Sequence, residues 1–175
     1  MKPLMLLCAL SVSLLLVLPV QAQSDEEEKS VEFFGGYGRV TTGDRCCVGS
    51  AHGFHLGIGY TPIRFLLLGA DFSHAEGTGQ AYVRHFHVGP QVRIPVKSLR
   101  PFGRVLAGVT DHRSNCQLGT DLVPITYRES SFGFGGGLDL QVHSRVYLRA
   151  FSFDRIRMED EWDLRASFGV VLLMF

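Results

Sequence analysis

Apolar and polar residues alternate with a period of two along most of the chain after residue 30. In the clearest segment, 54–61, large apolar side chains alternate with histidine, glycine and threonine. The same alternation marks segments 82–94 and 132–141. Because successive side chains of a β-strand point to opposite faces, this period predicts strands with one apolar face and one face of small or polar residues.

Eight such segments follow one another and are joined by connections of alternating length. The predicted strands are 31–41, 54–61, 65–75, 82–94, 101–112, 132–141, 146–157 and 163–175. Short turns are expected at 61–64, 95–100 and 142–145, and longer loops at 42–51, 76–80, 113–130 and 158–162. Strands of roughly 9–11 residues with this alternation of turns and loops are typical of membrane barrels. The sequence therefore predicts an all-β fold, an eight-stranded antiparallel up-and-down transmembrane β-barrel with its loops outside the cell.

The first residues differ from the rest of the chain and read as a secretion signal. Lys2 precedes an apolar run from Leu4 to Leu18, and small residues follow up to Ala22. This predicts a signal peptide over 1–22, too short for a convincing membrane-spanning helix. The acidic stretch 23–30 is expected to be a short disordered lead-in. The barrel domain is then 31–175, and no peptidoglycan-binding domain is expected after it.

Composition favours an apolar face that points outward into lipid. Charged residues make up 19% of the chain, against about 25% in soluble proteins. The polar face carries glycine, serine, threonine and histidine, which suit the narrow interior of a barrel. A soluble lipocalin-like barrel with an apolar interior is the less favoured alternative. Aromatic residues expected at headgroup level are Tyr37, Tyr60, Phe65, Tyr82, Phe102, Phe132, Tyr147 and Trp162.

Three segments carry a family resemblance that covers almost all of the chain after residue 30. The segments 31–37, 87–93 and 135–154 resemble successive strands of the OmpA-type outer-membrane β-barrel family. The end of the chain is similar to the targeting signal of outer-membrane proteins, with Phe175 one place beyond the apolar pair; its matching residues are Ser167, Gly169, Leu172, Met174 and Phe175. The resemblance implies a bacterial outer-membrane location and outer-membrane lipid and the barrel-assembly machinery as partners.

Charged residues on the predicted inner face form the first candidate site. They are Glu32, Asp71, Arg93, Asp139 and Arg165. Because a charge in a low-dielectric interior must be paired, we expect an ion-pair network that plugs the barrel. A gated pore lined by the same residues is the alternative. Arg149 and Asp154 fall on opposite faces by counting, and a β-bulge between them would bring both inside.

Cysteines and histidines form the second set of candidates. Cys46 and Cys47 fall in the first predicted loop and Cys116 in the third, so a disulfide between these loops is expected to staple them. His55, His85 and His87 are expected inside as hydrogen-bonded lumen histidines rather than as metal ligands. We expect no metal site and no cofactor.

Function is less constrained than fold. Lysine plus arginine and aspartate plus glutamate number 17 each, and this balance argues against nucleic acid as a partner. A lipid A acyltransferase or deacylase would need serine, histidine and an acid, which Ser73-His74 or His112 with Ser114 could supply beside Asp71, Glu76 or Asp111; His143-Ser144 falls at the wrong end. No enzymatic activity is expected. We expect a monomeric structural or weakly pore-forming barrel, with surface adhesion through the loops as a further alternative.

Overall fold

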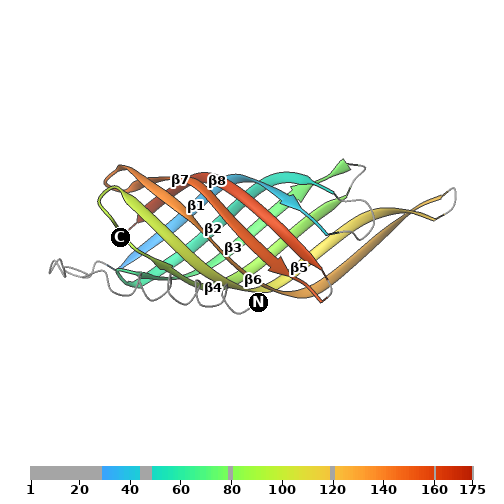
Figure 1. Cartoon of the computed structure of the whole chain (residues 1–175), viewed down its shortest axis with the longest axis horizontal. Helices are drawn as coiled ribbons and strands as arrows, with labels where there is room; N and C mark the ends of the chain where they lie inside the picture. The colour runs from blue at the N-terminus through green and yellow to red at the C-terminus, as the bar shows by residue number, and fades with distance from the viewer. Residues whose placement is uncertain (1–28, 44–48, 79–80, 119–120, 160, 175) are drawn as a thin grey trace, which may run out of the picture.

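The chain forms a closed barrel in which every strand pairs with its neighbours in sequence, and β8 pairs with β1 (Figure 1). The computed structural model describes residues 29–43, 49–78, 81–118, 121–159 and 161–174, without the side chains of 115–124. The strands are β1 Ser30–Thr41, β2 Ala51–Ile63, β3 Leu66–Glu76, β4 Tyr82–Arg93, β5 Leu99–Leu118, β6 Asp121–His143, β7 Val146–Arg157 and β8 Trp162–Met174. All eight pairings are antiparallel. The prediction of an eight-stranded up-and-down barrel is confirmed.

The two ends of the barrel differ. At one end, which we call the turn end, lie the start of β1, the end of β8 and the short connections after β2, β4 and β6. At the other, the loop end, lie the connections after β1, β3, β5 and β7. Ser30 already belongs to β1 rather than to a lead-in, and the predicted signal peptide 1–22 lies outside the described residues. Among the described residues, no helix is long and apolar enough to cross a membrane.

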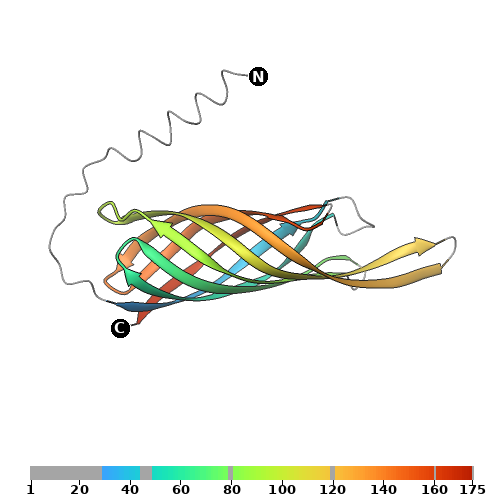
Figure 2. The same ribbon diagram turned by 90° about the horizontal axis from the view of Figure 1, so that it is seen from below.

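The predicted loop 113–130 is wrong, because most of it is strand. β5 and β6 stay paired to Leu118 and Asp121 and form a hairpin that projects beyond the rest of the barrel (Figure 2). The pairing of β4 with β5 ends at Arg113, and that of β6 with β7 starts at Phe132. Beyond the barrel wall the hairpin has no lipid-facing side, so its sequence lacks the alternation by which the other strands were recognised.

The outer wall is apolar and the interior is polar. The large side chains expected on the outer face are about half exposed, including Leu56 at 49%, Phe86 at 52% and Phe168 at 57%. The buried set, in contrast, is dominated by histidine, arginine, aspartate and serine. A water-soluble barrel would bury its apolar face, so this arrangement excludes the lipocalin-like alternative.

The structure corrects or completes the assignment of two strands' residues to the inner and outer faces. Phe102 was expected at the membrane surface but lies inside, 7% exposed; it shares the inner face of β5 with arginines, so hydrophobicity gave the wrong face. In β7 the register against β8 shifts between Arg149 and Ser152, and Ala150 and Phe151 both point outward. This irregularity places Arg149 and Asp154 inside together, as the bulge hypothesis required.

Small apolar residues line part of the interior at the loop end. The buried cluster there consists of Val40, Ala51, Ala75, Ala81 and Val83, which come from or adjoin the first four strands. Their side chains are too small to project far across the barrel. The remaining interior, toward the turn end, is filled by charged and hydrogen-bonding groups.

A substitution on the outer face tests the membrane setting. We expect Phe86→Arg, near the middle of β4, to reduce the free energy of unfolding in lipid vesicles by about 2–4 kcal/mol, because it places a charge in hydrocarbon. The matched control Phe86→Leu should have a much smaller effect. Denaturant titrations of the refolded chain, with heat-dependent gel mobility as the test of barrel formation, measure both. An equal stability of the Arg and Leu variants would contradict a lipid-facing wall.

Candidate functional site

The interior of the barrel holds equal numbers of buried acids and bases. Among the described residues, five carboxylates and five guanidiniums are less than a tenth exposed. The carboxylates are Glu32, Asp71, Asp139, Asp154 and Asp163. The guanidiniums are Arg93, Arg100, Arg104, Arg149 and Arg165. The charges therefore balance inside the barrel itself, as they must where water is scarce.

At the turn end, acids and bases alternate in a chain that crosses the lumen. Arg93 donates to Glu32, which also accepts from Arg100 at 2.8 Å. Arg100 donates at 3.0 Å to Asp139, and Arg149 donates to both oxygens of Asp139, at 2.8 and 3.2 Å. Two-pronged arginine–carboxylate bonds of this kind hold both partners in a fixed geometry. This group, which we call the turn-end cluster, joins strands β1, β4, β5, β6 and β7.

Arg149 is also held between two aromatic rings inside the barrel. Its Cζ atom lies 4.5 Å from the ring centroid of Phe34 and 4.3 Å from that of Phe102, distances typical of cation–π contacts. Glycine makes room for these rings: a Cβ at Gly36 would come within 2.7 Å of the Phe34 ring, and one at Gly137 within 2.8 Å of the Phe102 ring. Neither ring was predicted to point inward from the sequence.

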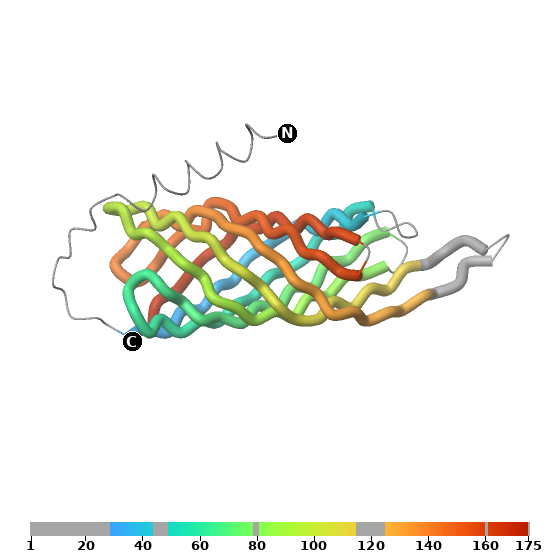
Figure 3. The backbone as a smooth tube through the Cα atoms, turned by 60° about the horizontal axis from the view of Figure 1, so that its bottom comes forward, coloured from blue at the N-terminus to red at the C-terminus, as the bar shows by residue number. Residues whose placement is uncertain are grey.

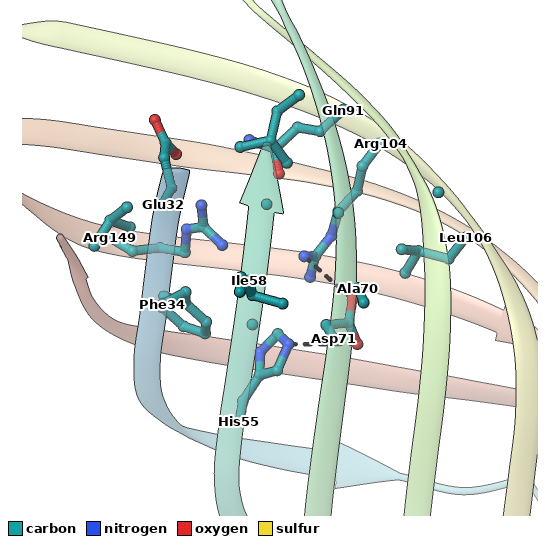
Figure 4. A pocket seen from close by; sticks show the side chains of 16 residues that line it. Glu32, Phe34, His55, Ile58, Ala70, Asp71, Gln91, Arg104, Leu106 and Arg149 are labelled. Carbon is teal, nitrogen blue, oxygen red and sulfur yellow. Dashed lines mark ion pairs between the residues drawn. The ribbon is translucent and has the colours of Figure 1, made fainter. Parts of the chain in front are cut away.

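Deeper in the lumen, two arginines and two aspartates form a closed ring of charges. Arg104 donates to both oxygens of Asp154, at 2.7 and 2.6 Å. Arg165 lies between Asp154 and Asp71 and donates to them at 3.1 and 2.9 Å. Asp71 completes the ring through Arg104 Nη1 at 3.6 Å and is also 3.5 Å from His55 Nε2 (Figure 4). We call this group the middle cluster.

The histidines lie toward the loop end and hydrogen-bond inside the lumen. His85 and His112 both direct Nε2 at Asp163 Oδ2, at 3.1 and 3.4 Å. His87 Nε2 lies 2.9 Å from Ser131 Oγ, and His55 Nδ1 lies 3.1 Å from Ser167 Oγ. Within the described part of the chain, no group of three or more histidine, cysteine, aspartate and glutamate side chains is arranged to hold a metal ion.

Of the serine–histidine pairs considered for catalysis, Ser73 and His74 are separated by the barrel wall, whereas His112 and Ser114 are both buried inside it. Ser73 points inward, and His74 lies on the outer face beside Glu76 and Arg84. Ser73 Oγ instead lies 3.0 Å from His85 Nδ1, and His85 Nε2 meets Asp163. This is a serine–histidine–aspartate chain, but its members are at most 3% exposed and Arg165 donates to the serine oxygen.

Little free volume remains around the clusters. The cavity between Glu32, His55, Asp71 and Arg104 has a volume of about 50 Å³, room for only a few water molecules. At the turn end the lumen widens into a vestibule of about 370 Å³ lined by the turn-end cluster residues Glu32, Arg93 and Arg100. The vestibule therefore ends at that cluster.

All five predicted lumen charges lie inside the barrel, where they belong to two separate clusters. Glu32, Arg93 and Asp139 belong to the turn-end cluster, and Asp71 and Arg165 to the middle cluster. Arg100 and Arg104 were not predicted as lumen charges. On the inner face of β5 they alternate with the apolar residues Phe102 and Leu106, and this mixed face hides the period of two. Asp163, the first inward residue of β8, was not predicted either.

Other predicted residues are only partly described. Ser167 points inward, where Ser152 Oγ lies 2.8 Å from its Oγ. Gly169 pairs with Gly36 in β1, and Leu172 and Met174 face outward, 41% and 47% exposed. Cys46, Cys47 and Phe175 lie outside the described residues, as does the side chain of Cys116. The predicted loop disulfide therefore stays a prediction.

Comparison with known proteins places the fold. No family model and no curated protein sequence matches the chain. Among solved structures, the attachment invasion locus protein Ail of Yersinia pestis is 18% identical with a TM-score of 0.60, over 86% of this chain and 100% of its own. Neisserial surface protein A is 15% identical with a TM-score of 0.58, over 82% and 96%. The N-terminal barrel domain of Pseudomonas aeruginosa OprF is 16% identical with a TM-score of 0.58, over 85% and 100%.

The resemblance to OmpA-type barrels therefore holds at the level of the fold. All three similar structures are outer-membrane or bacterial surface proteins of about this size. At 15–18% identity the likeness shows the fold alone, an eight-stranded barrel of the kind that these proteins have. The lumen clusters described above rest on this chain's own residues.

Removing one member of the middle cluster tests its energetic role. We expect Asp154→Asn to lower the free energy of unfolding by about 3–5 kcal/mol, because Arg104 and Arg165 then share one uncompensated buried charge. The control is Asp111→Asn, which breaks the exposed pair with Arg128 and should change stability little. Denaturant titration in lipid vesicles compares the two. A cost for Asp154→Asn no larger than for Asp111→Asn would show that the buried network does not hold the barrel together.

Proposed function

We propose that the protein is a monomeric barrel of the bacterial outer membrane whose lumen is plugged by its own ion pairs. It spans the membrane with the loop end facing outward and the turn end facing the periplasm. It acts as a structural surface element and conducts little or nothing. The export signal in 1–22 and recognition of the last strand by the barrel-assembly machinery belong to the same proposal.

The apolar outer wall supports the membrane location. Half-exposed phenylalanine, leucine and isoleucine side chains surround the barrel between its two ends. Such a surface is stable only against lipid, since soluble monomers rarely expose apolar patches of this extent. The orientation rests on the short turns at one end and, at the other, the long β1–β2 connection and the projecting β5–β6 hairpin, the usual arrangement of outer-membrane barrels.

The closed lumen is the observation that carries the proposal of a plug. Two charge clusters and the histidine bonds cross the interior at successive levels, and each arginine of the middle cluster contacts two carboxylates. The cavity of about 50 Å³ is far too small to let a sugar or a hydrated ion pass. A pore would need several of these ion pairs to open together, each leaving unpaired charge.

The same enclosure argues against an enzyme. The Ser73–His85–Asp163 chain has the atoms that a hydrolase uses. A lipid substrate, however, would have to reach Ser73 through the barrel wall or from the loop end past a buried cluster of small apolar residues. The serine oxygen also accepts a hydrogen bond from Arg165, which ties it into the middle cluster. We therefore propose a structural role for this chain of hydrogen bonds.

Attachment to other surfaces is a second candidate, favoured by the projecting β5–β6 hairpin. The coloured parts of β5 and β6 extend beyond the loop-end limits of the other strands (Figure 3). One of the similar structures is named for attachment and invasion. A two-stranded projection with no neighbouring strand offers both of its edges to a partner.

Liposome swelling tests plug against pore. We expect liposomes that contain the refolded barrel to swell in isotonic glucose no faster than liposomes without protein, because the lumen has no continuous path. Heat-dependent gel mobility of the same preparation shows that the barrel has inserted. Rapid swelling with confirmed insertion would overturn the plug and favour the gated pore.

Shortening the hairpin tests the attachment role. Replacement of 115–124 by a short Gly-Ser turn should leave heat-dependent gel mobility unchanged, because these residues pair with no strand outside the hairpin. Adherence of bacteria that display the protein to cultured epithelial cells should fall. The matched control is a hairpin of full length with the same residues in shuffled order. Unchanged adherence of the shortened variant would remove the hairpin as the attachment element.

A further inference from the structure

An open groove lies on the outer wall at the loop end, where β7, β8 and β1 run side by side. It has a volume of about 360 Å³ and is lined by Thr41, Thr42, Arg155, Trp162 and Leu164, among others. The strand register places these residues close together, since Leu164 pairs with Arg155 on one side and with Thr41 on the other. The groove therefore combines a guanidinium, an indole and hydroxyl groups on a surface outside the lumen network.

Among the described residues, no carboxylate neutralises the charge in this groove. Arg155 and Arg157 both lie over the ring of Trp162, with Cζ at 4.3 and 5.6 Å from its centroid. Neither arginine forms an ion pair with another residue that the structure describes. Other outward arginines at this end are occupied: Arg128 binds Asp111, and Arg84 donates to His74.

The acids that the structure describes near the groove form no ion pair with Arg155 or Arg157. Asp163, which contributes to the groove, directs its carboxylate into the lumen toward His85 and His112. Glu159 and Glu161 lie beyond β7, in its connection to β8. Arg155, which lines the groove, and Arg157, which shares the Trp162 ring with it, therefore offer two guanidiniums with donor groups suited to an anion with several oxygens.

Its position relative to the apolar wall identifies the kind of anion. On the turn-end side of the groove, Phe153 of β7 and Phe168 of β8 are each about half exposed, and so is Phe134 of β6, which pairs with Arg155. Apolar rings at one edge and stacked arginines and an indole at the other match a lipid, whose acyl chains lie in hydrocarbon while its headgroup lies at the interface. A free anion would make no use of the apolar edge.

We propose that this groove binds the phosphate headgroup of an anionic lipid in the outer leaflet. Arg155 and Arg157 contact the phosphate, Thr41 and Thr42 donate from the β1 side, and Leu164 with the phenylalanines below contacts the acyl chains. The inference rests on the proposed function, since it requires the loop end to lie in the outer leaflet. It assigns the protein one fixed lipid partner on β7 and β8.

The chain carries its own probe for this site, because Trp162 is its single tryptophan. Titration of the barrel in neutral maltoside micelles with dihexanoyl phosphatidylglycerol should give a saturable change in Trp162 fluorescence. Dihexanoyl phosphatidylcholine, which has the same chains and no net charge, should give a much weaker change, and so should inorganic phosphate. Native mass spectrometry of the same samples counts bound lipids independently of the fluorescence.

The matched variants are Arg155→Gln and Arg84→Gln, each of which removes one outward guanidinium that stacks on an aromatic ring. We expect Arg155→Gln to weaken phosphatidylglycerol binding about tenfold or more, and Arg84→Gln to leave it within about twofold. Equal weakening by both variants, equal response to phosphatidylcholine, or full competition by inorganic phosphate would overturn the site. Heat-dependent mobility separates the two proposals: a chain that inserts as a barrel but binds no anionic lipid refutes only the groove, whereas a chain that does not insert refutes the proposed function as well.

Discussion

The interior of an eight-stranded barrel is too narrow to hydrate the charges that it contains, and this constraint shapes the rest of the molecule. Five carboxylates and five guanidiniums must neutralise one another across the lumen. They can do so only if strands far apart in the sequence hold them at matching heights. Arg165 on β8, for example, bonds Asp71 on β3, 94 residues away in the chain. The network therefore selects one register for the barrel as it fills the lumen.

Local backbone features serve this pairing. The irregularity in β7 leaves two successive residues, Ala150 and Phe151, on the outer face. Without it, either Arg149 or Asp154 would face lipid, where an isolated charge is costly. Glycines at 36 and 137 leave room for the rings of Phe34 and Phe102, and these rings hold Arg149 in line with Asp139. The β7 irregularity, the two glycines and the two aromatic rings therefore all help to position the guanidinium of Arg149.

The outer wall is under a different constraint from the lumen, because its side chains contact lipid, whereas the lumen side chains contact one another. An outer-face position requires an apolar side chain, but lipid does not require a particular one. At the loop end the outer surface again carries polar groups, because arginine, tryptophan and threonine lie together at the border of the apolar wall. The proposed lipid contact and the lumen network are therefore separate sites, and each can be altered without touching the other.

The sequence by itself determined the strand count, the order of turns and loops, and the outward face of most strands, because lipid on one side imposes a period of two. It also identified half of the lumen charges. Only the tertiary structure decided that Phe102 points inward, that Arg149 and Asp154 share a face, and that β5 and β6 continue beyond the barrel. The physical reason is the same in each case. Strand phase inside the lumen is set by partners across the barrel, and a hairpin outside the membrane has no lipid to mark its faces.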